Sequence, residues 1–247
     1  MIHGSHPELL ADPWGNWVHE RFHSGPEGRV EAYGNIIKHG IKGNDPFSSE
    51  EIARSFWVNF VEKAEAYNEP GHFTAMTGFE WTSTPAGDNL HRVVIFRDGA
   101  EKTGQTLPFS MFDSADPQDL WKYLASYEAK TGGQAIAIPH NGNLSNGLMF
   151  SEKTFKGKKI DNEYAKTRMR WEPIIEMTQM KGDGETHPLL SPGDEFADYE
   201  QWDLSNLAGT VAKTDDMLQY EYARSALKLG LQISKETGVN PYKFGMS

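Results

Sequence analysis

Carboxylate and imidazole side chains stand where apolar runs of this sequence begin or end. Glu80 ends one apolar run, His91 begins the next, and His140 follows a third. Glu185 and His187 lie in the glycine-containing segment that follows a fourth run. Imidazole nitrogens and carboxylate oxygens together suit zinc, manganese and iron. The residue types therefore predict a site for divalent metal ions.

The segments around Glu80 and His91 indicate two strands joined by a reversal. Residues 73–82 and 91–97 are rich in aromatic and β-branched residues, and residues 84–89 between them form a dense turn signal. If the chain reverses there, the end of one strand and the start of the next share one edge of a sheet. We therefore expect the Glu80 carboxylate and the His91 imidazole to lie side by side.

Helical patterns alternate with such strands along the rest of the chain, as capping signals, helical spacing of apolar residues and glycine stops indicate. Helices are expected at residues 49–67, 116–131, within 151–170 and 215–237, and further strands at 135–139 and 173–178. This alternation predicts α/β layering with a mostly parallel sheet or barrel, in which sites gather at the carboxyl ends of strands.

Residues 1–47 show no comparable pattern. They contain scattered aromatic residues, turn-forming glycine and proline, and five of the nine histidines. We interpret them as a mostly irregular segment. Because the chain has no repeats, low-complexity tracts or linkers, the sequence predicts a single domain over residues 1–247, with the regular part at 48–247.

Composition excludes several classes of function. The chain of 247 residues carries 24 basic and 35 acidic residues, a net charge of −11, which disfavours nucleic acid and anionic membranes as partners. Without cysteine there is no disulfide, thiolate nucleophile or cysteine-bound metal. Phosphate-binding glycine loops and the serine-hydrolase elbow are also missing. No apolar stretch is long enough for a membrane span and no signal peptide is present, so we expect a soluble protein. The sequence does not indicate its cellular compartment.

Each candidate residue also has a structural interpretation, which remains open at this point. A histidine after a strand is often a hydrogen-bonded loop residue, and Glu80 could be a buried carboxylate that accepts backbone hydrogen bonds. Lys181 or Arg92 could offset the charge of a substrate, but solvated salt bridges are the preferred interpretation of both residues.

The chain resembles a bacterial family of uncharacterised proteins in four blocks of sequence, at residues 77–84, 89–92, 138–143 and 181–188. That family is grouped with the polymerase and histidinol phosphatase (PHP) superfamily of metal-dependent hydrolases. The resemblance implies a distorted (β/α)7 barrel of the TIM type with a two- or three-metal centre that hydrolyses phosphoesters.

Carried over by position, the resemblance assigns metal-binding roles to three residues. Glu80 matches the metal-bridging glutamate of the superfamily, His91 the histidine that follows it, and His140 the histidine of a later strand end. Glu185 and His187 are particular to the smaller family and are expected at the mouth of the site as catalytic residues, either as metal ligands or as substrate contacts.

Two ligand pairs of the superfamily, an initial His-x-His and a final Asp-x-His, do not occur in this sequence. His3 and His6 are separated by two residues. We therefore expect the chain to be an internal piece of a longer protein, with a barrel incomplete at both ends and a weakened metal centre.

The function expected is that of a metal-dependent hydrolase, a phosphoesterase that uses zinc, manganese or iron on a small-molecule phosphoester. The alternative is a catalytically silent binding or assembly domain on a degenerate scaffold of the same kind. The sequence leaves the oligomeric state open.

Overall fold

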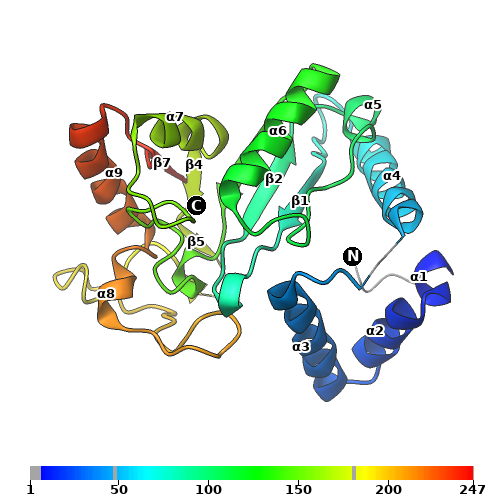
Figure 1. Cartoon of the computed structure of the whole chain (residues 1–247), viewed down its shortest axis with the longest axis horizontal. Helices are drawn as coiled ribbons and strands as arrows, with labels where there is room; N and C mark the ends of the chain where they lie inside the picture. Colours follow the sequence, from blue (N-terminus) through cyan, green and yellow to red (C-terminus); the bar gives the residue numbers. More distant parts are fainter. Residues whose placement is uncertain (1–6, 47–48, 180–181, 247) are drawn as a thin grey trace.

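A three-stranded antiparallel sheet is the largest sheet of the computed structural model, which describes residues 7–46, 49–179 and 182–246 (Figure 1). Its order is β1 (Gly78–Trp81), β2 (Arg92–Phe96) and β3 (Ala135–Pro139). The register sets Glu80 opposite Val93 and Arg92 opposite Pro139. The end of β1, the start of β2 and the end of β3 therefore share one edge of the sheet.

The reversal between β1 and β2 is confirmed, but the expectation of a mostly parallel arrangement is wrong for this sheet. The reason is an additional pass of the chain between β2 and β3. Helix α5 (Ala100–Thr103) follows β2, and the segment 104–116 then runs back along the sheet before α6 (Pro117–Thr131) returns. Strand β3 consequently starts beside the end of β2, with Ala135 opposite Phe96.

The remaining strands form two short pairs. Strand β4 (Ile174–Glu176) pairs in parallel with β7 (Phe244–Met246), and β5 (Thr178–Gln179) pairs with β6 (Gly182–Asp183) in antiparallel fashion. Strand β4 also lies next to β3. The described strands thus form three separate sheets, and the closed barrel stays a prediction.

Helices pack around the sheets and enclose an aromatic core that includes Trp57, Trp81, Trp121 and Tyr127. Predicted capping signals are present: Ser49 Oγ accepts from the Ile52 N–H, and the Asp116 carboxylate accepts from the Gln118 N–H. The long helix expected at 215–237 is divided in the structure. The other helices and the 3-10 turns are α4 (Glu50–Tyr67), η1 (Pro85–Gly87), η2 (Gly142–Leu144), α7 (Asn162–Trp171), α8 (Asp215–Leu218) and α9 (Ala223–Thr237).

The interpretation of residues 1–47 as irregular is wrong, since three helices occupy the described part of this segment. The Asp12 carboxylate caps the second helix through the Gly15 N–H at 2.7 Å, and Pro13 and Pro26 occupy first-turn positions, where proline is favoured. These helices have a small core of their own around Val18 and Phe22. They are α1 (Pro7–Ala11), α2 (Pro13–His23) and α3 (Pro26–Lys42).

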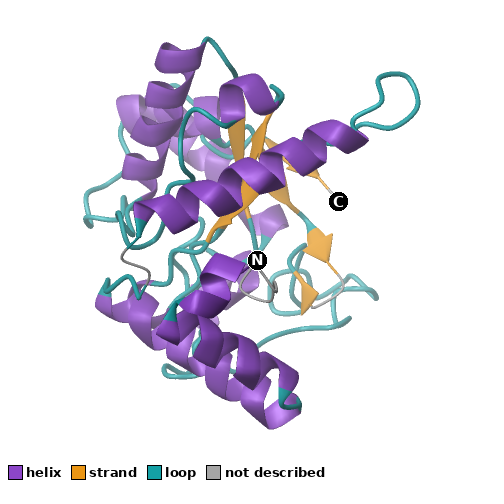
Figure 2. Cartoon of the chain, turned by 90° about the vertical axis from the view of Figure 1, so that its right-hand side faces the viewer, coloured by secondary structure: helices purple, strands orange, loops and turns teal. Residues whose placement is uncertain are grey.

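Helices α2 and α3 lie below the strands in Figure 1 and stay there in the turned view of Figure 2. Helix α3 also approaches the turn η1, which connects β1 to β2. Among the described residues, no helix combines the length and apolar character needed to cross a membrane.

Candidate metal centre

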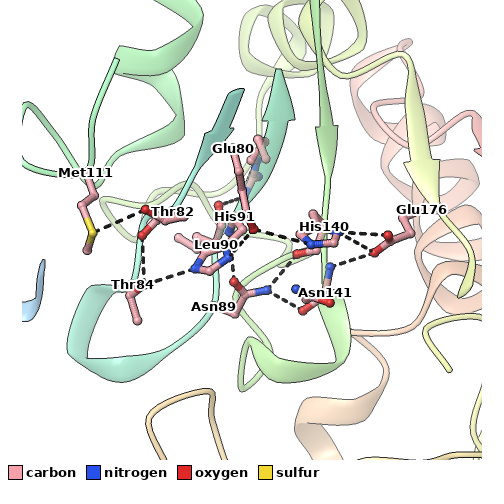
Figure 3. A network of polar contacts seen from close by, with 11 residues as sticks. Glu80, Thr82, Thr84, Asn89, Leu90, His91, Met111, His140, Asn141 and Glu176 are labelled. Atoms are coloured by element: carbon pink, nitrogen blue, oxygen red, sulfur yellow. Dashed lines mark hydrogen bonds and ion pairs between the residues drawn. The ribbon is translucent and has the colours of Figure 1, made fainter. Parts of the chain in front are cut away.

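One oxygen of Glu80 is the meeting point of two imidazole rings (Figure 3). His91 Nδ1 lies 3.0 Å from Glu80 Oε1, and His140 Nε2 lies 3.5 Å from the same atom. The three residues proposed from the sequence as metal ligands therefore lie together, although they belong to three different strand ends. Whether they bind a metal stays a prediction.

Backbone pairing fixes the relative position of these residues. The His140 N–H donates to the His91 carbonyl at 3.1 Å, which extends the β2–β3 ladder one step past the Arg92–Pro139 pair. Asn89 ties the same two loops together, because its side-chain amide donates to the carbonyls of His140 and Asn141 at 2.8 and 2.6 Å. These hydrogen bonds thus hold the site at one edge of the sheet.

Glu176, at the end of β4, holds the far side of His140. His140 Nδ1 lies 2.9 and 3.1 Å from the two oxygens of Glu176. Asn141 turns the chain directly after His140 in the left-handed conformation, at φ 54°, and its N–H donates to Glu176 Oε2 at 2.9 Å. Because an ionised carboxylate only accepts, Nδ1 carries a proton, and Nε2 is the nitrogen that His140 presents to Glu80.

Thr84 plays the equivalent part for His91. Its hydroxyl donates to the Thr82 carbonyl at 3.0 Å, so its oxygen is left to accept from His91 Nε2, which lies 3.3 Å away. His91 therefore presents Nδ1 to Glu80. With these tautomers, the outer nitrogen of each histidine donates to an acceptor and the inner nitrogen faces the Glu80 carboxylate.

The order Thr84–His91–Glu80 also matches the hydroxyl–imidazole–carboxylate order of nucleophilic triads. Thr84 does not fit that role. The residue is 5% exposed, and its proton is directed at Thr82 rather than at the imidazole. Thr84 is better explained as the acceptor that orients His91.

The donor set fits a divalent cation. In metal sites, ligating histidines donate their second N–H to a carboxylate, carbonyl or similar acceptor, which is the arrangement seen at both histidines here. The Glu80 side chain is 43% exposed whereas that of His140 is 15% exposed, so the group opens to solvent on the side of Glu80. In the part of the chain that the structure describes, no set of three or more His, Asp or Glu side chains forms a ready-made ligand cage. A bound ion would take the place of the contacts that the inner nitrogens make with Glu80.

Glu185 forms a second polar group with α9. Its Oε1 atom lies 2.8 Å from Arg224 Nε and 2.6 Å from Nη2, while Arg224 Nη1 lies 2.5 Å from Asp194. Hydrogen bonds to Asp194 and Glu185 raise the pKa of Arg224. These residues, with Asp183 and others, line a cavity of about 360 Å³. Glu185 thus forms an ion pair with Arg224 beside this cavity.

His187 is buried at 4% exposure. Its Nδ1 accepts from the Leu189 N–H at 3.2 Å, and its ring packs against Tyr222 with centroids 5.6 Å apart. Nε2 lies 3.3 Å from Asp203 Oδ1, at ion-pair distance but without hydrogen-bond alignment. The structure gives Glu185 and His187 partners of their own, and their catalytic role stays a prediction.

The interpretation of Arg92 as a solvated or substrate-facing cation is wrong. Its side chain is 1% exposed and pairs with Glu172 at 2.9 Å, and Arg168 pairs with the other oxygen of Glu172 at 3.0 Å. Arg92 therefore belongs to a buried ion network in the core. Lys181, and also His3 and His6, lie outside the described residues.

Sequence reasoning missed Glu176 and Thr84 as parts of the site. Glu176 did carry a signal, because it closes an apolar strand just as Glu80 does. What the sequence lacked was the position of β4 beside β3. Thr84 lay inside a turn signal and offered no sign of a contact with His91.

The chain belongs to DUF3604, a family of proteins of unknown function, whose profile matches residues 27–247. All of the site residues described above lie within this match. No curated protein and no solved structure gives a significant match.

Proposed function

We propose that this protein is a metal-dependent hydrolase of the PHP type, a phosphoesterase in which Glu80, His91 and His140 hold a divalent cation. The observation that carries the proposal is the shared geometry of the two histidines. Each has its outer nitrogen anchored, by Thr84 or Glu176, and each directs its inner nitrogen at Glu80 Oε1. Such anchoring fixes the tautomer and the ring orientation that metal binding requires.

The side chains have separable tasks in this proposal. Glu80 supplies the negative charge and, being the most exposed of the group, faces the side from which a substrate arrives. Glu176 and Thr84 keep the two rings in place. A bound zinc, manganese or iron ion would supply an activated water and Lewis acidity toward a phosphoryl oxygen. The choice of a small-molecule phosphoester as substrate, and of the barrel as scaffold, rests on the sequence resemblance.

The proposal is tested by metal content and hydrolysis together. Tag-free protein is incubated with Zn²⁺, Mn²⁺ or Fe²⁺, dialysed, and assayed by elemental analysis and with p-nitrophenyl phosphate. We expect Glu80→Gln and His140→Ala to lose both metal and activity. Glu163→Gln is the matched control, because Glu163 is a solvent-exposed helix residue whose carboxylate pairs with the neighbouring Lys166 on the same helix. Unchanged metal content in Glu80→Gln would refute the assignment.

The second candidate is a catalytically silent binding or assembly domain. The direct contact of His91 Nδ1 with Glu80 Oε1, at 3.0 Å, favours it, because in the other tautomer of His91 the Nδ1–H donates to this carboxylate and no ion is needed. The missing His-x-His and Asp-x-His pairs point the same way. In that case the wild-type chain retains no more metal after dialysis than Glu80→Gln does, with any of the three ions.

A further inference from the structure

Helix α2 carries the sequence His19-Glu20-Arg21-Phe22-His23, in which two histidines are four residues apart. Residues at this spacing lie one above the other on the same helix face. The structure confirms this for the two rings, whose centroids are 4.1 Å apart with planes tilted by 36°. The spacing is the one by which helical His-Glu-x-x-His segments hold zinc.

The Nε2 atoms of this pair are the candidate metal ligands. His23 Nδ1 lies 2.8 Å from the His19 carbonyl, which can only accept, so Nδ1 carries the proton and Nε2 keeps its lone pair. His19 Nδ1 is buried and has no hydrogen-bond partner within the described part of the chain. Among the described residues, neither Nε2 atom is held by a hydrogen bond. A carbonyl that orients one ring is a common feature of metal-binding histidines.

The surroundings of the pair favour a cation. His23 is the last residue of α2, and the carbonyl end of a helix carries partial negative charge. The positive charge of Arg21 does not lie beside the two histidines, because Arg21 is on the opposite side of the helix, where it contacts the Trp17 ring and Glu31. His23 is exposed and His19 is half-buried, so an ion can reach them.

We propose that His19 and His23 form a binding site for a divalent transition metal such as zinc, nickel or copper, with water in the remaining positions. Imidazole ligands suit these ions. The site lies outside residues 27–247, so it stands independently of the family match and of the Glu80 centre. It is a binding site only: Glu20 Oε1 accepts from Asn16 at 3.1 Å and is directed one turn away from His23, so no hydrolytic role follows.

The test is a calorimetric titration of tag-free, full-length protein with ZnCl2 and with NiCl2. The variants are His19→Ala, His23→Ala and their double mutant. His39→Ala is the matched control, because His39 is a histidine on the neighbouring helix α3 with no histidine four residues away. His140→Ala separates this site from the Glu80 centre. We expect each single variant to weaken one binding event by at least about tenfold, as expected when a chelating ligand is lost, while His39→Ala and His140→Ala retain that event.

A second readout guards against loss of structure in the variants. Zinc bridging positions 19 and 23 ties one helical turn together, so hydrogen exchange of the α2 amides should slow when zinc is added to wild-type protein but not when it is added to His23→Ala. If the double variant binds zinc and nickel with wild-type stoichiometry and affinity, the proposal is wrong.

Discussion

His140 and Glu176 are joined through His140 Nδ1 and both oxygens of the Glu176 carboxylate, although the two residues come from strands of different sheets. The contact sets the orientation of the ring and leaves Nε2 facing Glu80. Glu176 is therefore a positioning residue of the proposed centre, and its removal is the most direct test of that arrangement.

Glu176→Gln should reduce metal affinity by about 10- to 100-fold, the usual effect of losing a carboxylate behind a ligating histidine. The substitution keeps the size of the side chain but removes its charge and one acceptor. Affinity is measured by competition with a chromophoric chelator. Glu163→Gln serves as control, and equal affinities of the two variants would contradict the role of Glu176.

Thr84→Val should destabilise the chain and loosen His91, because valine fills the same space but leaves His91 Nε2 without its acceptor. The expected loss is about 1–3 kcal/mol of unfolding free energy, the usual range for an unsatisfied buried polar group. Urea unfolding provides the measurement. Thr84→Ser keeps the hydroxyl and should behave like the wild type; a loss of similar size in both variants would instead indicate a packing effect of the methyl group.

The buried network of Arg92, Glu172 and Arg168 should make the fold sensitive to acid. Burial alone would raise the pKa of Glu172, but the two guanidinium groups hold that pKa below its ordinary value. A carboxyl whose pKa is lower in the folded state contributes stability above its unfolded value of about 4.3 and loses that contribution as the pH falls further. The urea concentration at the midpoint of unfolding should therefore decrease as the pH is lowered below about 4.3.

Glu172→Gln tests the same network at neutral pH. It leaves two buried guanidinium groups without their counter-ion, and breaking a buried pair in this way costs about 3–5 kcal/mol. The variant should also lose part of the acid dependence seen in the wild type. Glu50→Gln, which affects the exposed pair with Arg54, is the matched control and should cost less than about 1 kcal/mol.

His187→Ala and His140→Ala should differ in what they remove. His140→Ala should lower the metal content directly. His187→Ala should leave the metal content unchanged, since His187 contacts Leu189, Asp203 and Tyr222 instead. Elemental analysis and steady-state kinetics on both variants decide the matter; if His187→Ala loses metal as completely as His140→Ala, His187 belongs to the centre.

The sequence predicts those parts of the site whose position depends on segments that are close together in the chain. Glu80 and His91 flank one reversal, so turn chemistry and strand patterns were enough to place them together. Glu176 depends on the packing of β4 beside β3, which no local pattern encodes. The sequence does not indicate the direction of β3 for a similar reason, because segment 104–116 carries no periodic signal that would reveal an extra pass along the sheet.

Other residues obscure some of the local signals in residues 1–47. The Asp12 cap and the first-turn prolines Pro13 and Pro26 predict helices, but histidines and glycines scattered among them suggested loop. The opposite error occurred at residues 215–237, where apolar spacing continued across the break between α8 and α9.

The parallel pairing of β4 with β7 has a consequence for the order in which the centre assembles. Glu80, His91 and His140 belong to successive strands of one sheet, whereas the ladder partner of β4 lies at residues 244–246. Closing a long loop costs more entropy than closing a short one, so contacts between distant segments tend to form late. During folding the three proposed ligands should therefore meet first, and Glu176 should lock His140 only when the C-terminal strand docks. A partly folded chain without that strand would bring Glu80, His91 and His140 together, but the His140 ring would not yet be oriented by Glu176.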